Sequence, residues 1–344
     1  MQELMELMGQ VNTIANAYKR SQILFTALDG NVFAFLEQPA TAAFIAEKTG
    51  WSLRGTAMLL DGLVAVNLVT KENGVYRNGE AASACLVPGA PAWQGDILRH
   101  TQASWPAWAE LPKCVATGDC SDVREHELSG TALRNFILGM DNVASFSAPE
   151  VLRSVDLSRY ASVLDLAGGP ATYSAVFLKA HPGMRATLFD RAAVVALARE
   201  KVEAAGLQDR FSYVAGDCLT DPLGGPYDLV FMSNIIHSWS PEQNEAVVRK
   251  AHAALAPGGS LIIKDFLVDN DRSGPAWSLI FSLHMLVHTP GGGTYTFEEV
   301  QGWTDRAGFL PGRAVSVTQQ TRLWIADKSK QPGGPCHAER TDTP

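Results

Sequence analysis

The stretch Ser162-Val-Leu-Asp-Leu-Ala-Gly-Gly-Pro-Ala-Thr-Tyr-Ser174 decides the fold of this chain. Residues 163–166 form an apolar run typical of a buried strand, and residues 173–180 have the pattern of a helix. A strand, a glycine turn and a helix start make the first unit of a nucleotide-binding α/β sheet. Gly168 and Gly169 let a ligand approach the backbone where a Cβ would block it. Pro170 suits the first helical turn, where its missing N–H costs nothing.

Four more short apolar runs follow, at residues 186–190, 211–217, 227–233 and 260–266, with helical segments between them. This alternation predicts an α/β fold with a Rossmann-like, doubly wound parallel sheet. Residues 314–318 and 322–326 then predict two strands joined by a short polar turn, which fits an antiparallel hairpin at the edge of the sheet.

The first hundred residues predict a separate, mainly helical domain. A helix over 41–50 and a second from Ser52 precede a hairpin with Asn73-Gly74 at its turn, and this order is typical of a winged helix. A DNA-binding regulator is one interpretation and a protein-interaction domain is the other. The helix that would enter a DNA groove carries a single basic residue, Arg54, and an acidic one, Asp61. Because it has no excess of positive charge, DNA binding is disfavoured.

The chain therefore predicts four parts. Residues 1–100 form the winged-helix domain, and residues 101–150 form a helical, aromatic-rich connector. Residues 151–328 form the α/β domain, and residues 329–344, rich in Pro, Gly and charge, form a disordered tail.

Composition narrows the function classes. The formal net charge of −8 weighs against nucleic acid as a partner, and no apolar run reaches the roughly 18 residues of a membrane span. The acidic N-terminus has no basic region typical of a signal peptide. The five cysteines show no CxxC pairing, which predicts free thiols in a reducing cytoplasm and no metal site.

Two motifs that are absent from the glycine turn narrow the class of ligand that it can bind. Neither GxGxxG nor the phosphate-loop pattern is present. Acids instead occur along the strands: Asp165 lies in the first, Asp190 ends the second and Asp217 follows the third. Parallel strand ends share one rim of the sheet, where ligands bind. Acids there can bind the hydroxyls of a ribose, the amine of an adenine and an ammonium group. This set of contacts suits an adenosine that bears an amino-acid tail and no phosphate, namely S-adenosylmethionine.

At these residues the chain resembles the small-molecule O-methyltransferases of the caffeate and acetylserotonin type, together with their bacterial antibiotic-pathway relatives. The resemblance covers residues 10–328. Its most specific segments are Leu164-Asp-Leu-Ala-Gly-Gly-Pro170, Gly216-Asp217, Asn234-Ile-Ile-His-Ser-Trp-Ser240, Pro257-Gly-Gly259 and Thr289-Pro-Gly-Gly-Gly-Thr-Tyr-Thr296. It implies a homodimer formed through the winged-helix domain. It also implies cofactor contacts at Gly168, Asp190 and Asp217.

Methyl transfer to a hydroxyl benefits from a base, and histidine is the natural proton acceptor near neutral pH. His237 follows the fourth strand and matches the family's catalytic histidine, although Ser238 replaces the family's next residue, an aspartate. Asp265 ends the fifth strand and matches an acid that orients the histidine. The family has a second acid beside the histidine, and this chain has Thr294 at that position. The histidine therefore lacks an acidic neighbour on one side.

The acceptor side is predicted from apolar residues. Phe136, Met140 and Met285 resemble the family's pocket for a flat ring, and Trp105 is a further candidate. His284 and His288 are spaced as metal ligands on a helix can be, but no third ligand is evident and a pocket or helix-face position is favoured.

The sequence thus predicts an S-adenosylmethionine-dependent O-methyltransferase that methylates a hydroxyl of an aromatic or polyketide-like small molecule. A C- or N-methyltransferase of the same fold, for example on a tetrapyrrole, is an alternative. So is a relative that uses the bound cofactor for decarboxylation or hydroxylation, a possibility raised by Ala167 and Ala171 at positions where glycine is usual. A winged-helix regulator is the alternative from a different class.

Overall fold

The computed structural model describes residues 1–118, 128–318 and 320–331. The chain divides into two compact units, Met1–Ser104 and the part from Trp105 onward. The finer division, with a connector over 101–150 and a tail over 329–344, stays a prediction. Residues 332–344 of that tail lie outside the described residues.

The first unit contains the predicted winged helix. Thr41 and Ser52 cap the two short helices by accepting hydrogen bonds from the backbone N–H groups of Phe44 and Gly55. Asn73 and Gly74 both have positive φ, as a tight hairpin turn requires. The three strands pair in the order β1-β3-β2. The elements are α1 (Gln2–Asp29), α2 (Val32–Phe35), β1 (Ala40–Thr41), α3 (Ala42–Thr49), α4 (Leu53–Ala65), β2 (Val69–Glu72), β3 (Val75–Asn78), α5 (Glu80–Cys85) and α6 (Gly95–Ala103).

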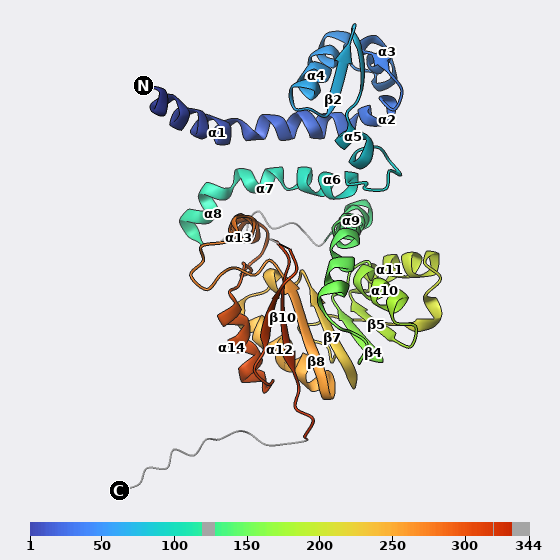
Figure 1. The fold of residues 1–344 in the computed structure, drawn as a ribbon, viewed down its shortest axis with the longest axis vertical. Coiled ribbons are helices and arrows are strands. Elements are labelled where there is room, and N and C mark those ends of the chain that lie inside the picture. Colours follow the sequence, from blue (N-terminus) through green and yellow to red (C-terminus); the bar gives the residue numbers. More distant parts are fainter. Residues whose placement is uncertain (119–127, 319, 332–344) are drawn as a thin grey trace. The chain divides into compact units, whose positions relative to one another are not determined.

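The second unit is built on a sheet of seven strands in the order β6-β5-β4-β7-β8-β10-β9 (Figure 1). The five strands from β6 to β8 are parallel, and β10 and β9 form the antiparallel edge hairpin. The predicted doubly wound sheet and its edge hairpin are therefore confirmed. The strands are β4 (Ser162–Leu166), β5 (Arg185–Asp190), β6 (Phe211–Ala215), β7 (Tyr227–Ser233), β8 (Leu255–Asp265), β9 (Arg313–Ser316) and β10 (Arg322–Asp327).

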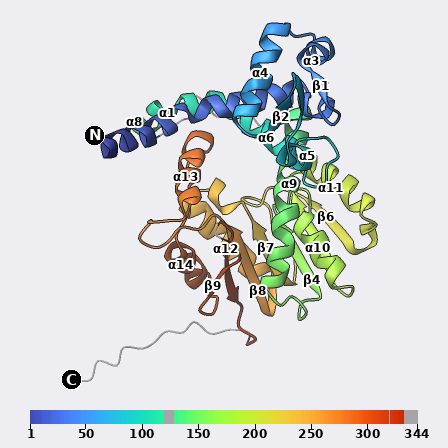
Figure 2. The same ribbon diagram turned by 45° about the horizontal axis from the view of Figure 1, so that its top comes forward.

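Helices cover both faces of this sheet, as Figures 1 and 2 show. One face packs against α9, α10 and α11 through a cluster that includes Phe177, Leu188 and Phe231. The other face packs against α12 and α14 through a cluster that includes Val248 and Trp303. The helices and short turns of this unit are α7 (Trp105–Ala109), α8 (Leu111–Thr117), α9 (Gly130–Ser154), α10 (Thr172–Ala180), α11 (Ala192–Ala204), η1 (Gln208–Arg210), η2 (Ile236–Ser238), α12 (Pro241–Ala254), α13 (Ala276–His288) and α14 (Phe297–Ala307).

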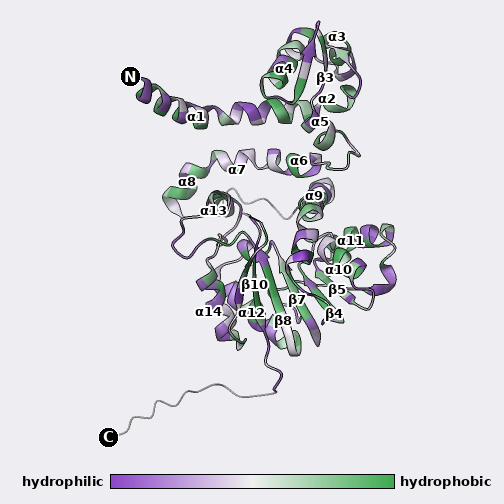
Figure 3. Cartoon of the chain, viewed as in Figure 1, coloured by the Kyte–Doolittle hydropathy of each residue, from purple (hydrophilic) through white to green (hydrophobic). Residues whose placement is uncertain are grey.

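Helix α14 illustrates how these layers form. Its Thr296 N-cap and Glu299 make a capping box, and Val300 and Trp303 are buried on the side that packs. Figure 3 shows both hydrophobic and hydrophilic residues along α14, as expected for a helix with one packed and one solvated face.

Two local predictions are wrong. Pro170 does not lie in the first turn of a helix, because Ala171 takes a left-handed conformation as N-cap and α10 begins at Thr172. Strand β8 begins at Leu255, five residues before the run predicted over 260–266, so residues 257–259 lie inside the strand. Gly259 fits there because a Cβ would lie 2.9 Å from the Asp228 carbonyl oxygen of the neighbouring chain segment.

The cysteine prediction is wrong at one position. Cys85 and Cys218 are free thiols, but Cys114 is disulfide-bonded. A disulfide depends on the approach of two Cβ atoms in space, which the search for CxxC spacing does not detect. Cys120 and Cys336 lie outside the described residues. Among the described helices, none combines the length and the apolarity that a membrane span requires.

Candidate functional site

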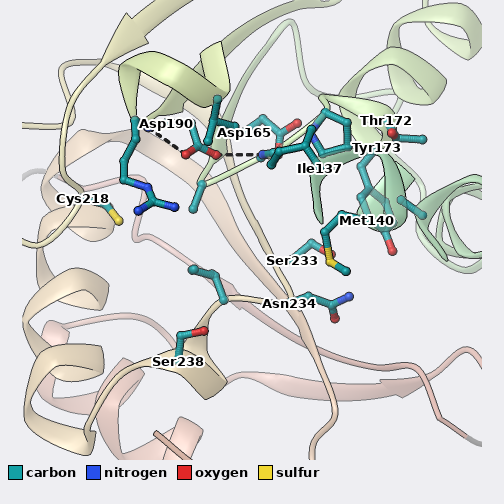
Figure 4. A pocket seen from close by; sticks show the side chains of 18 of the residues that line it. Ile137, Met140, Asp165, Thr172, Tyr173, Asp190, Cys218, Ser233, Asn234 and Ser238 are labelled. Atoms are coloured by element: carbon teal, nitrogen blue, oxygen red, sulfur yellow. Dashed lines mark hydrogen bonds between the residues drawn. The ribbon is translucent and has the colours of Figure 1, made fainter. Parts of the chain in front are cut away.

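A cavity of about 430 Å³ lies at the carboxyl ends of β4, β5, β6 and β7, in the second unit. This is the rim where the acids at the strand ends predict a ligand. Figure 4 shows that side chains from the strand ends and from α9 point into it. Seven predicted residues line the cavity: Asp165, Gly168, Gly169, Asp190, Asp217, Phe136 and Met140.

The glycine turn after β4 has an unusual backbone. Ala167, Gly169 and Ala171 all have positive φ, between 54° and 61°. At Gly168 a Cβ would lie 2.4 Å from the carboxyl carbon of Asp165 and 2.6 Å from Leu188. At Gly169 a Cβ would meet nothing within 4 Å, and this residue lines the cavity. Gly168 therefore permits close packing below the turn, and Gly169 leaves its backbone open to a ligand.

Asp165 is an almost fully buried acid beneath this turn. Its Oδ2 accepts a hydrogen bond from the Ser174 hydroxyl, whereas its Oδ1 is buried without a partner within the described part of the chain. Desolvation by burial raises the pKa of Asp165 to about 6. A buried carboxylate oxygen with no donor is a place where a ligand cation is favourable.

Asp190, at the end of β5, is tied to the glycine turn. The N–H of Gly169 donates to Asp190 Oδ2 at 2.9 Å, and the N–H of Arg191 donates to Oδ1 at 2.7 Å (Figure 4 marks these contacts). Burial raises the pKa of Asp190, although these two N–H groups oppose the shift. Asp217, beyond β6, is exposed and accepts a hydrogen bond from the Leu219 N–H. Both acids keep oxygen lone pairs for hydroxyl or amine donors of a ligand.

His237 and Asp265 form the second part of the site. His237, in η2, lies with its Nδ1 2.7 Å from Asp265 Oδ1, and both residues are buried. Asp265 also accepts hydrogen bonds from the N–H groups of Ile235 and Phe266. Burial alone would raise the pKa of Asp265, but the charge and hydrogen bond of His237 outweigh it, with smaller help from Phe266 and Lys264, and hold that pKa below its ordinary value.

The segment after α13 holds His237 from the other side. The Gly293 N–H donates to the His237 carbonyl oxygen at 2.9 Å. A Cβ at Gly292 would lie 2.2 Å from that same oxygen, so only glycine allows this approach. Thr294, where the resemblance places an acid, is buried, and its hydroxyl oxygen has no partner among the described residues.

Four predicted residues do not line the cavity: His237, Asp265, Met285 and Trp105. Ser238 and Trp239, which follow His237 in the chain, do line it. Met285 is buried in α13, whereas Trp105, at the start of α7, is 41% exposed.

Several lining residues are not among those predicted from the sequence, namely Ile137, Tyr173, Ser233 and Asn234. Ile137 lies on the same helix as Phe136 and Met140, and Met140 follows it by three residues. Ser233 and Asn234 end and follow β7, so the rule that ligands bind beyond parallel strand ends could have found them. Phe281 was also missed; its ring lies edge-on to His237, with centroids 4.9 Å apart.

His284 and His288 lie in a row of neighbouring rings: the His284 ring contacts those of Phe281 and His288. The Trp108 indole N–H donates to His284 Nδ1 at 3.1 Å, and His288 Nδ1 lies 2.9 Å from the His284 carbonyl oxygen. Nowhere in residues 1–118, 128–318 and 320–331 do three or more His, Cys, Asp or Glu side chains form a cluster able to hold a metal ion.

Two protein-family models match the chain. Residues 120–310 match the model of an O-methyltransferase domain, and residues 12–88 match that of an O-methyltransferase dimerisation domain. The chain is similar to the tetracenomycin polyketide synthesis 8-O-methyltransferase of Streptomyces glaucescens, with 30% identity over 94% of this chain and 97% of that protein.

Two further proteins are similar over most of their length. The 3-hydroxy-5-methyl-1-naphthoate 3-O-methyltransferase of Streptomyces sahachiroi is 31% identical over 88% of this chain and 89% of its own. The crystal structure of human N-acetylserotonin methyltransferase in complex with S-adenosylmethionine superposes with a TM-score of 0.86 at 26% identity, and the match covers 94% of this chain and 98% of that one. The chain therefore belongs to the family of S-adenosylmethionine-dependent O-methyltransferases that carry an N-terminal dimerisation domain.

Proposed function

We propose that this enzyme transfers the methyl group of S-adenosylmethionine to a hydroxyl of an aromatic or polyketide-like small molecule, with His237 as general base. The observation that carries the proposal is the buried contact between His237 Nδ1 and Asp265 Oδ1, because the two residues after His237 line a cavity that Asp165 and Asp190 also line. The dyad supplies a base, and the acids beside the glycine turn supply a site for the methyl donor.

The cavity suits the methyl donor in size and in polarity. About 430 Å³ falls within the range of small-molecule sites, roughly 300–1,000 Å³. We assign the two ribose hydroxyls to Asp190 and the adenine amine to Asp217. The unpartnered Oδ1 of Asp165 suits the ammonium group of the amino-acid tail. Gly168 and Gly169 complete the wall without side chains that would fill the space.

When bound, S-adenosylmethionine supplies a methyl group on a positively charged sulfur, which an acceptor oxygen can displace in line. The chain's own residues align the acceptor and remove its proton. His237 Nε2 has no hydrogen-bond partner within the described part of the chain, whereas Nδ1 is held by Asp265. Asp265 therefore fixes the tautomer with hydrogen on Nδ1 and stabilises the imidazolium that forms when Nε2 takes the proton. General-base help of this kind contributes about 10²–10⁴-fold.

Apolar side chains of α9 support a flat, hydrophobic acceptor. Phe136, Ile137 and Met140 line one side of the cavity. Aromatic and thioether groups favour planar rings by shape and polarizability. The names of two similar proteins refer to tetracenomycin polyketide synthesis and to a naphthoate. We infer that Met285 belongs to the same acceptor pocket, and we keep Trp105 as a further candidate.

A homodimer is the proposed assembly. The dimerisation-domain match covers 12–88. On α1, apolar residues recur at intervals of three and four and are each at least half exposed: Leu4, Leu7, Val11, Ile14 and Tyr18. Such spacing is typical of a helix that packs against a partner helix. A cytoplasmic location stays a prediction, and the disulfide at Cys114 argues against the all-thiol interpretation behind it.

A panel of hydroxylated naphthoates, anthraquinones and simple phenols, incubated with methyl-labelled S-adenosylmethionine, tests the activity. We expect label in at least one product, attached to oxygen by NMR. Label on carbon or nitrogen would replace the O-methylation proposal by the alternative named above. Consumption of the cofactor without any labelled acceptor would overturn methyl transfer as the function.

A further inference from the structure

Lys264 is a buried lysine beside the dyad that the catalytic proposal leaves without a role. It is 2% exposed, at the carboxyl end of β8, immediately before Asp265. Its Nζ donates to Asn234 Oδ1 at 2.8 Å, and no carboxylate pairs with it within the described residues. An ammonium group has three N–H donors, and one amide oxygen, two aromatic rings 5.6 Å away and the charge of Asp265 satisfy it only in part. Lys264 does not itself line the cavity, so its charge can reach a ligand there only through Asn234.

Strand register places this charge on the same face of the sheet as Asp165. Asp165 is paired with Phe231, and Ser233 with Lys264, across adjacent parallel strands. Because side chains alternate along a strand, Phe231 and Ser233 share one face, and their partners lie on it too. Asp265, next in the chain, points to the opposite face. Lys264 thus lies on the face of the sheet that carries Asp165, and Asp265 lies on the other face.

Asn234 connects Lys264 to the cavity. It lines the cavity, and its backbone is left-handed, with φ of 53°. Because Lys264 engages the amide oxygen, the amide nitrogen with its two N–H donors is turned away from Lys264. Figure 4 shows Asn234 and Ser233 toward the side of the cavity away from Cys218. The Ser233 hydroxyl oxygen is itself buried without a partner in the described part of the chain.

The start of α10 adds donors at this side. Thr172 and Tyr173 line the cavity, and the Tyr173 ring lies 5.6 Å from Lys264 Nζ. The N-cap, Ala171, makes no side-chain capping bond, so the Thr172 and Tyr173 N–H groups at the start of this nine-residue helix keep their donor capacity, whereas the Ser174 N–H already interacts with the Asp165 carboxyl. A helix N-terminus favours negative charge. A buried ammonium, an oriented amide and an uncapped helix start therefore converge on one kind of group, an anionic oxygen.

We propose that Lys264 and Asn234, with the first turn of α10, recognise the carboxylate of the amino-acid tail of S-adenosylmethionine. This inference rests on the proposed cofactor site. Asp190 and Asp217 take the adenosine end, so the tail extends toward Asn234. The tail is a zwitterion, and the same face of the sheet offers the acid Asp165 for its ammonium and Lys264 for its carboxylate. Lys264 is a positioning residue, because it acts on the ligand through the Asn234 amide.

Calorimetry with two ligands tests the proposal without an acceptor. The first ligand is S-adenosylhomocysteine, and the second is its decarboxylated analogue, which keeps the adenosine and the amine. Lys264→Met removes the charge and keeps most of the volume. We expect it to weaken S-adenosylhomocysteine binding about tenfold, as for loss of a charge-assisted contact, and to leave binding of the analogue unchanged. Lys264→Arg should restore much of the preference for the carboxylate.

Asn234→Asp is the second variant, since it keeps the shape, tolerates the left-handed backbone and retains a partner for Lys264. It replaces the amide donors by an acceptor, so it should also weaken S-adenosylhomocysteine selectively. Lys328→Met is the control, because Lys328 donates to the carbonyls of His252 and Leu255, which do not line the cavity. Equal loss for both ligands, or an unchanged preference in Lys264→Met and Asn234→Asp, would overturn the proposal. A wild-type enzyme that binds neither ligand would instead refute the proposed cofactor site.

Discussion

His237 Nδ1 lies 2.7 Å from Asp265 Oδ1, and the carbonyl oxygen of the same histidine accepts the N–H of Gly293 at 2.9 Å. The ring is thus oriented by the end of β8, and the backbone is fixed by the segment after α13. A base held at both points can present Nε2 to an acceptor with little reorganisation, which is how positioned groups lower a barrier.

Removal of the base should slow the reaction without affecting the cofactor. We expect His237→Ala to lower kcat at least tenfold, the weak end of general-base effects, with the affinity for S-adenosylhomocysteine near that of wild type. Steady-state kinetics and calorimetry measure the two quantities. His181→Ala, at the end of α10 and away from the cavity, is the matched control. Unchanged turnover in His237→Ala would remove the base role.

The close approach of Gly292 to the His237 carbonyl oxygen can be tested by adding a single methyl group. In Gly292→Ala the new Cβ would lie 2.2 Å from the His237 carbonyl oxygen, so the backbone must shift and displace the ring. We expect kcat to fall by at least tenfold. In Gly293→Ala the nearest atom would be 3.7 Å from the Cβ, and activity should stay within about twofold of wild type. Similar activity in the two variants would show that this approach does not position the base.

Asp165 predicts a pH dependence of cofactor binding. Because burial raises its pKa to about 6, the carboxyl gains a proton as the pH falls through 6 and can no longer attract an ammonium group. Binding of S-adenosylhomocysteine should therefore weaken between pH 7 and pH 5, as calorimetry at fixed ionic strength can measure. In Asp165→Asn the affinity should be lower at pH 7 and should lose most of this dependence. An unaltered pH profile in the variant would assign the dependence to another acid, with Asp190 the first candidate.

The raised pKa of Asp165 also affects the stability of the protein. It makes the free energy of unfolding fall as the pH rises, whereas an acid paired with a base makes it rise. The raised pKa means that the folded state holds the Asp165 proton at pH values where the unfolded chain, with a pKa near 3.8, has released it. Asp165 therefore lowers the free energy of unfolding of the ligand-free protein as the pH rises from about 4 to 6. Urea unfolding of wild type and Asp165→Asn at pH 5 and pH 7 should show the difference narrowing at the lower pH.

The exposed apolar residues of α1 predict where the dimer forms. Val11→Glu and Ile14→Glu place charges on side chains that are 67% and 80% exposed, so the unit itself should remain folded. We expect the double variant to sediment as a monomer at micromolar concentration, where wild type sediments as a dimer. Lys19→Glu, on the same helix and outside the apolar series, controls for charge alone. A wild-type monomer at that concentration would contradict the proposed assembly.

Much of the fold was predictable because it follows from local patterns. Short apolar runs alternating with helices specify a parallel sheet, and Asn73-Gly74 specifies a hairpin turn, since these signals depend on neighbours along the chain. The acids at the strand ends were found because parallel strands deliver their carboxyl ends to one rim. The placement of Asp165, Asp190 and Asp217 on the cavity follows from that rule and agrees with the structure.

The remaining features depend on distances between segments far apart in sequence. Nothing local marks Lys264 as different from a surface lysine, and only the register between β7 and β8 brings it to Asn234. Gly292 is a second example. A side chain is excluded there by the carbonyl oxygen of His237, which lies 55 residues earlier in the chain. The sequence by itself determined the sheet, the glycine turn and the type of ligand. Tertiary packing decided which buried side chains keep a charge or an oxygen without a full set of partners. A side chain is desolvated only when segments distant in sequence pack around it.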